Sequence, residues 1–73
     1  MSELDFVKKM IELMDTEDEI SMDSRLEDID EWDSLSHIAF LSMCTAASDR
    51  KIFSSDIKKA ETIRDLYVLY MGL

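Results

Sequence analysis

The stretch EWDSLSHIAFLSMC, residues 31–44, decides the fold, because an acidic segment turns here into an apolar helix. Asp33 and Ser34 stand at the junction, where short side-chain oxygens can accept hydrogen bonds from the free N–H groups of a first helical turn. The apolar residues that recur at helical spacing after them are Leu35, Ile38, Leu41 and Cys44. This spacing predicts a helix from about Ser34 to Ala47 that buries these four side chains.

The same helix should have a flank and an outer side. We expect Phe40 and Met43 to flank the buried stripe. The outer side should carry the small residues Ser36, Ala39, Ser42, Thr45 and Ala46. Ser34 then lies exposed at a helix N-terminus, where free N–H groups and aligned peptide dipoles favour a phosphate. On spacing alone, however, the role to expect of Asp33 and Ser34 is that of an ordinary helix cap.

A first helix is predicted to begin after Ser2 and to end near Met14 or Asp15. Ser2 can cap it, and acidic residues in its first turn are favourable there. Two apolar rows give it a wide inward face: Phe6, Met10 and Leu13, and Val7, Ile11 and Met14. The connection over residues 16–33 is acidic, and we expect apolar residues to pin it to the core: Ile20, Met22, Leu26 and Ile29. Residues 26–29 can form a short helical turn.

The C-terminal third predicts two more helices after a polar loop over residues 48–51. Ser54 or Ser55 should cap a short helix that contains Ile57 and Ala60. Thr62, with Asp65 three residues later, has the spacing of a capping box for the last helix. Its expected inward face is Ile63, Leu66, Tyr67 and Tyr70. No β pattern is present, so the 73 residues predict an all-α fold, one domain over residues 1–73 built as a small four-helix bundle with a long first loop and a very short third helix.

Composition excludes some functions. The formal charge of −9 argues against nucleic-acid binding, because like charges repel. Residues 1–33 hold 13 acidic and 3 basic residues, a net charge of −10, and residues 34–73 hold 4 acidic and 5 basic residues, a net charge of +1. The acidic half either keeps the protein soluble or steers it toward basic partners. With one cysteine, no apolar run long enough to span a membrane and no signal peptide, a cytoplasmic protein is the simplest expectation.

Three kinds of site are excluded by the residues themselves. A calcium-binding EF-hand loop starting at Asp28 would need Gly and Glu where Asp33 and Ala39 stand. Asp33, Ser34 and His37 could suggest a hydrolase, but no second segment supplies an oxyanion site, and His37 is expected to be an exposed first-turn residue. A single His and a single Cys do not make a structural zinc site. We therefore expect no catalytic residues and no metal.

The motif Asp33-Ser34-Leu35, followed by an apolar helix, resembles the attachment motif of acyl carrier proteins. The resemblance continues without a gap to about Tyr70 and takes in residues 26–29 upstream. Trp32 before the motif is similar to the branch of the family that has Trp-Asp-Ser-Leu. The resemblance implies an acyl-carrier-type bundle, monomeric and not itself an enzyme.

The resemblance also implies roles for individual residues. A separate phosphopantetheinyl transferase would attach phosphopantetheine from coenzyme A to Ser34 with the help of magnesium, and the thiol of that group would carry an acyl chain as a thioester. Asp33 matches a residue that presents the metal and the serine to the transferase, and Leu35 matches one that packs at partner interfaces. The positions that match the family's acyl cavity are Leu41, Cys44, Ile52, Ala60 and Ile63.

The chain departs from carriers of ordinary fatty acid synthesis on the helix after Ser34. Acidic residues are usual on the outer side of that helix, but the matching positions here are uncharged: Ala39, Thr45, Ala46 and Ala47. Ser48 and Phe53 stand where an aromatic residue and Pro are common. These differences favour a specialised lipid, polyketide or related pathway, with acyl-loading, condensing or acyl-transfer enzymes as partners. An aminoacyl or peptidyl carrier, or a helical interaction module that is never modified, remains as an alternative.

Overall fold

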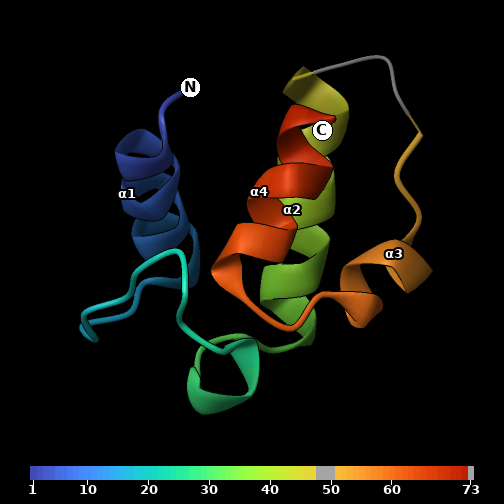
Figure 1. The fold of residues 1–73 in the computed structure, drawn as a ribbon. Coiled ribbons are helices and arrows are strands. Elements are labelled where there is room, and N and C mark those ends of the chain that lie inside the picture. The colour runs from blue at the N-terminus through green and yellow to red at the C-terminus, as the bar shows by residue number, and fades with distance from the viewer. Residues whose placement is uncertain (48–50, 73) are drawn as a thin grey trace.

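Four α-helices make up most of the described chain, residues 1–47 and 51–72 of a computed structural model (Figure 1). They are α1 (Glu3–Met14), α2 (Ser34–Ala47), α3 (Ser54–Lys59) and α4 (Ile63–Met71), with a short 3₁₀ turn, η1 (Leu26–Asp28), between α1 and α2. Within the described residues, β pairing is limited to one isolated bridge between Arg25 and Thr62. The predicted all-α four-helix bundle is therefore confirmed. None of the described helices has the length and apolar character needed to cross a membrane.

Both ends of α1 and the start of α4 are those that the sequence predicts. Ser2 Oγ accepts a hydrogen bond from the backbone N–H of Asp5 at 3.1 Å, and α1 ends at Met14. At the start of α4, Thr62 Oγ1 accepts from the Asp65 N–H while Asp65 Oδ2 accepts from the Thr62 N–H, each at 3.2 Å. This reciprocal pair is the predicted capping box, and it satisfies donors that the first turn leaves without a helical partner.

The start of α3 differs from the prediction. Neither Ser54 nor Ser55 caps this helix, because both lie inside its first turn and Phe53 is the residue that precedes it. The Phe53 N–H instead donates to Asp56 Oδ2 at 3.1 Å. Ala60 also lies outside the helix, which ends one residue earlier. The preceding residues of the predicted polar loop, 48–50, lie outside the described part of the chain.

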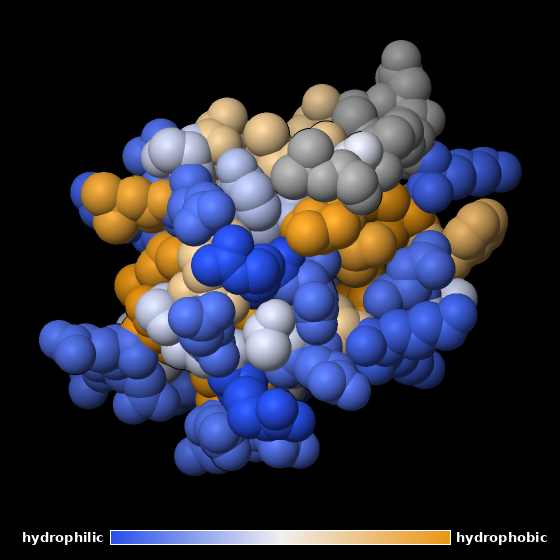
Figure 2. Space-filling model, viewed as in Figure 1, coloured by the Kyte–Doolittle hydropathy of each residue, from blue (hydrophilic) through white to orange (hydrophobic). Residues whose placement is uncertain are grey.

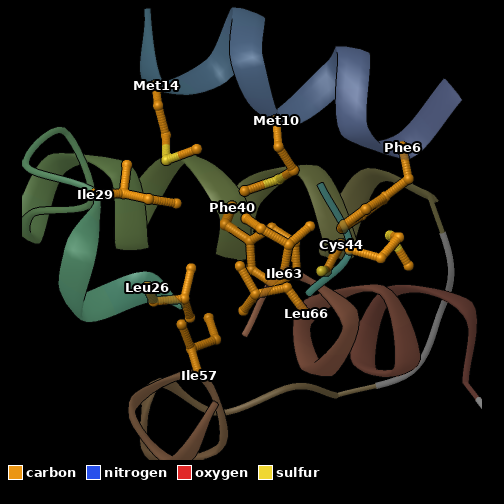
Figure 3. Packing of buried hydrophobic residues seen from close by; sticks show 11 residues of the cluster. Phe6, Met10, Met14, Leu26, Ile29, Phe40, Cys44, Ile57, Ile63 and Leu66 are labelled. Carbon is orange, nitrogen blue, oxygen red and sulfur yellow. The ribbon is translucent and has the colours of Figure 1, made fainter. Parts of the chain in front are cut away.

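The core is a single cluster of side chains from all four helices and the long loop (Figure 3). Its eleven buried apolar members are Phe6, Met10, Met14, Met22, Leu26, Ile29, Phe40, Cys44, Ile57, Ile63 and Leu66. Phe6 is fully buried and packs edge-on against Phe40 and Tyr67, with ring centroids 6.3 and 5.2 Å away. The inward faces predicted for α1 and α4 are largely confirmed, although Ile11 lies at the edge of the α1 face and is only half-buried.

The buried face of α2 agrees with the prediction only in part: Cys44 is buried and Leu41 is partly buried, but the first half of the helix differs. Leu35 and Ile38, expected to point inward, are 77% and 63% exposed, whereas Phe40, expected on the flank, is fully buried. Ser36, expected on the outer side, is also buried, and its hydroxyl donates to the Glu31 carbonyl at 2.6 Å. That bond removes the cost of burying the hydroxyl, so a serine can occupy the inward side. The helix is therefore rotated so that residues four apart, 36, 40 and 44, face the core.

The long loop is held in place by buried apolar side chains and by main-chain hydrogen bonds. Its apolar residues Met22, Leu26 and Ile29 are buried, as predicted, and residues 26–28 form η1. The main chain also pairs with the start of α4 and the residue before its cap: the Leu26 N–H donates to the Glu61 carbonyl at 2.8 Å, and the Arg64 N–H to the Met22 carbonyl at 2.8 Å. The loop thus lies beside the first turn of α4, although the two segments are far apart in the sequence.

Candidate functional site at the start of α2

Asp33 is the cap of α2. Its Oδ1 accepts a hydrogen bond from the Ser36 N–H at 3.0 Å, and its carbonyl accepts from the His37 N–H at 3.0 Å. The hydrogen bond from the Ser36 N–H holds the pKa of the Asp33 carboxyl below its ordinary value, against a smaller opposing effect of desolvation. The carboxylate is therefore ionised at neutral pH and exposed beside Ser34, where it could help to hold a divalent cation brought by a partner.

Ser34 is the first residue of α2 and its side chain is exposed. Because Asp33 supplies the cap, the Ser34 hydroxyl is not needed to begin the helix. Ser36, two residues later, is its opposite: it is 6% exposed and its hydroxyl is bound to the main chain of Glu31. Of the two serines, Ser34 is the one that a modifying enzyme can reach.

Two large apolar side chains follow Ser34 on the surface. Leu35 and Ile38 lie three residues apart, which places them next to each other on one side of the helix. The residues that continue this outer surface are Ala39, Ser42, Thr45 and Ala46, all exposed and uncharged, as predicted. The outer surface of α2 is thus apolar near Ser34 and neutral beyond it, which suits contact with another protein better than contact with water alone.

Trp32 and His37 form the other side of this site. Their rings are 4.5 Å apart between centroids, and Trp32 also packs against Phe40 at 6.2 Å. His37 is therefore half-buried rather than the exposed first-turn residue that the sequence suggested. Through these contacts of Trp32 with His37 and Phe40, the segment before Ser34 packs against the core. Sequence reasoning missed this contact, although two aromatic rings on either side of a helix start could have indicated it.

The five positions matched to an acyl cavity all belong to the core cluster or pack against it. Cys44 and Ile63 are buried members of the cluster, and both are drawn in Figure 3. Leu41, Ile52 and Ala60 are partly buried and pack against it. A shallow hollow of about 380 Å³ between α3 and α4 reaches Ala60 but is not lined by Cys44 or Ile63. The structure therefore places these residues in or against the packed core, and of the five only Ala60 lines this hollow.

Among the described residues, no group of three or more His, Cys, Asp or Glu side chains is arranged to hold a metal ion. Comparisons of the chain with protein-family models, with curated proteins and with solved structures give no match. The function must therefore be argued from the residues themselves.

Proposed function

We propose that this protein is an acyl carrier in which Ser34 is modified with phosphopantetheine. The observation that carries the proposal is the placement of Ser34: exposed, first in α2, beside an ionised Asp33 and followed by the exposed Leu35. The resemblance of the Asp33-Ser34-Leu35 motif and the following helix to acyl carrier proteins gives this placement its chemical meaning.

The residues present fit such a group. The Ser34 hydroxyl lies at the surface and is not engaged in the cap, so a transferase can approach it without unfolding α2. Asp33 would keep its negative charge beside the hydroxyl and could orient a magnesium ion that the transferase holds. When attached, phosphopantetheine supplies a flexible arm with a thiol that carries an acyl chain as a thioester. Leu35 and Ile38 would then contact the enzymes that load or receive the chain.

The neutral outer surface of α2 supports a specialised set of partner enzymes. Exposed charges act chiefly on association rates, so their position decides which surfaces are steered together. Here 13 of the 17 acidic residues lie before Ser34, and Asp28 and Asp30 are both exposed, whereas the outer side of α2 carries none. Enzymes with a basic site that must meet an acidic α2 would be poorly steered, which favours a lipid, polyketide or related pathway with its own enzymes.

The test is the intact mass of the protein after incubation with coenzyme A, magnesium and a transferase of broad specificity. The protein should gain the mass of one phosphopantetheine group. Ser34→Ala should fold with the same helix content and gain nothing. Ser42→Ala is the matched control, because Ser42 is another exposed serine of α2, and it should be modified like the unaltered chain.

Two outcomes would contradict the proposal. Modification of Ser34→Ala would show that the site is elsewhere. A chain that stays unmodified while a standard carrier in the same tube is modified would favour an unmodified helical interaction module. If the chain is modified, loading with acyl or aminoacyl substrates then distinguishes an acyl carrier from an aminoacyl or peptidyl carrier.

A further inference from the structure

A second apolar surface lies along α1, away from Ser34. A groove of about 670 Å³ runs between α1 and the loop of residues 16–21, and a smaller hollow of about 390 Å³ adjoins it. The two share Leu4, Val7 and Ile20, and Ile11 extends the groove along the helix. Leu4 is 64% exposed. In Figure 2, hydrophobic surface appears among hydrophilic side chains on the left, which is the side of α1 in Figure 1.

The loop wall of this groove is strongly acidic. Glu17, Asp18 and Glu19 are consecutive, exposed and part of the lining, and Lys8 is the basic residue opposite them. The ion pairs found within residues 1–47 and 51–72 involve other acidic residues, so these three carboxylates are not neutralised by a neighbour in the described chain. The groove therefore combines an apolar floor with a negative edge.

The wall is also held in place before anything binds. Thr16 is 7% exposed, and its hydroxyl donates to Glu31 Oε1 at 2.9 Å. Thr16 Oγ1 also accepts a hydrogen bond from the Asp18 N–H at 3.1 Å. These bonds fix the beginning of the loop against the segment that leads to α2. A partner would not have to order the beginning of this wall, which lowers the entropic cost of association.

We propose that this groove docks a basic amphipathic helix of a partner protein. The floor from Leu4 to Ile11 covers eight residues of α1 and is about 10 Å long, which matches two turns of a docked helix. Apolar side chains of the partner would contact Leu4, Val7 and Ile20, and its Lys or Arg side chains would meet the acidic edge. The described residues contain no strand whose edge could receive an extended peptide instead.

The negative charge of the chain argues against a second copy of it as the partner that binds the groove. Each copy carries a net charge of −9, and the groove edge lies in the more acidic half of the sequence. Two copies would therefore repel each other where the groove requires a basic surface. The inference does not depend on the modification of Ser34, because Ser34 does not line the groove.

The experiment uses the full chain, labelled with ¹⁵N, and a synthetic helix-forming peptide of Leu, Ala and Lys with Leu at helical spacing on one face. We expect amide shifts at Leu4, Val7 and Ile20, and binding that weakens as salt is raised. Two control peptides should bind at least about tenfold more weakly: one with the same residues in an order that destroys the apolar face, and one with Glu in place of Lys.

Matched variants locate the binding. Leu4→Ser should weaken binding about tenfold, because an exposed leucine that becomes buried contributes strongly to contact. Phe53→Ser removes an apolar side chain of similar exposure, 60%, that precedes α3 and does not line the groove, so this variant should leave binding unchanged. Replacing Glu17, Asp18 and Glu19 by their amides should remove most of the salt dependence.

Several results would overturn the proposal: no binding, equal binding of Leu4→Ser and the unaltered chain, or loss of binding in Phe53→Ser. Dimerisation of the chain through the groove, seen as a doubled mass in solution that Leu4→Ser abolishes, would also overturn it.

Discussion

Replacing Phe40 tests which face of α2 is buried. Phe40 is fully buried and packs edge-on against Phe6 and Trp32, whereas Leu35 on the same helix is 77% exposed. If residues 36, 40 and 44 face the core, Phe40→Ala must be far more damaging than Leu35→Ala. If the helix instead buried Leu35 and Ile38, the order would be reversed.

The expected difference is large compared with the stability of so small a domain. Removing a buried Phe costs about 3–5 kcal/mol, and the two aromatic contacts place Phe40→Ala toward the upper end of that range. A 73-residue domain typically has only about 4–11 kcal/mol of unfolding free energy in total. Leu35→Ala should change stability by less than about 0.5 kcal/mol, because the side chain is already in water.

Urea unfolding followed by circular dichroism measures the difference. With a slope near 1 kcal/mol per molar urea, Phe40→Ala should lower the midpoint by about 3 M or more, or leave the chain unfolded in water. Phe40→Leu keeps the test usable in that case, because it retains most of the apolar volume and should cost about 1–2 kcal/mol. Ile38→Ala is a second surface control. A loss for Leu35→Ala or Ile38→Ala as large as that for Phe40→Leu would refute the orientation of α2.

Three further predictions concern the start of α2 and the core. The lowered pKa of Asp33 means that its capping contribution to stability is present above the ordinary carboxyl pKa and is lost as the pH falls through the lowered value. Asp33→Asn should therefore lose less stability than the unaltered chain between neutral and acidic pH. Urea midpoints that fall by the same amount in both proteins over this pH range would contradict the prediction. Ser36→Ala should cost about 1 kcal/mol, or about 4–8 °C in melting temperature, because it breaks a buried hydrogen bond, whereas Ser34→Ala should melt within a few degrees of the unaltered chain. If a medium-length acyl chain on the Ser34 arm enters the core near Cys44 and Ile63, the loaded protein should melt higher than the unloaded one; equal melting with unchanged NMR shifts of these two residues would place the acyl chain outside.

Local sequence rules predicted the helix ends where one residue acts on its near neighbours. Ser2, with Asp5 three residues on, and Thr62 with Asp65 bond across three positions, so the spacing alone contains the necessary geometry. The bounds of α2 were predicted for the same reason. The exposed position of Ser34 also followed, because a helix start at Asp33 leaves the next side chain pointing outward.

The buried face of α2 could not be predicted in this way. Apolar residues occur on nearly every side of this helix, so the spacing of Leu35 and Ile38 fits one orientation as well as Phe40 and Cys44 fit another. The choice depends on whether a buried Ser36 can find a partner, and that partner is the Glu31 carbonyl in the preceding loop. A distant contact of this kind cannot be read from periodicity. The groove beside α1 was missed for a similar reason, because it requires the path of the loop.

The pairing between the long loop and the start of α4 has a consequence for how the chain reaches its folded state. The main chain near Met22 and Leu26 completes its hydrogen bonds only when residues 61–64 lie beside it. Local helices form within about a microsecond, but contacts between segments this far apart must first close a long stretch of chain and therefore form more slowly. The loop that leads to Ser34 should thus be among the last parts to acquire its final path. During refolding, the Leu26 amide should therefore become protected from hydrogen exchange later than the amides of α1.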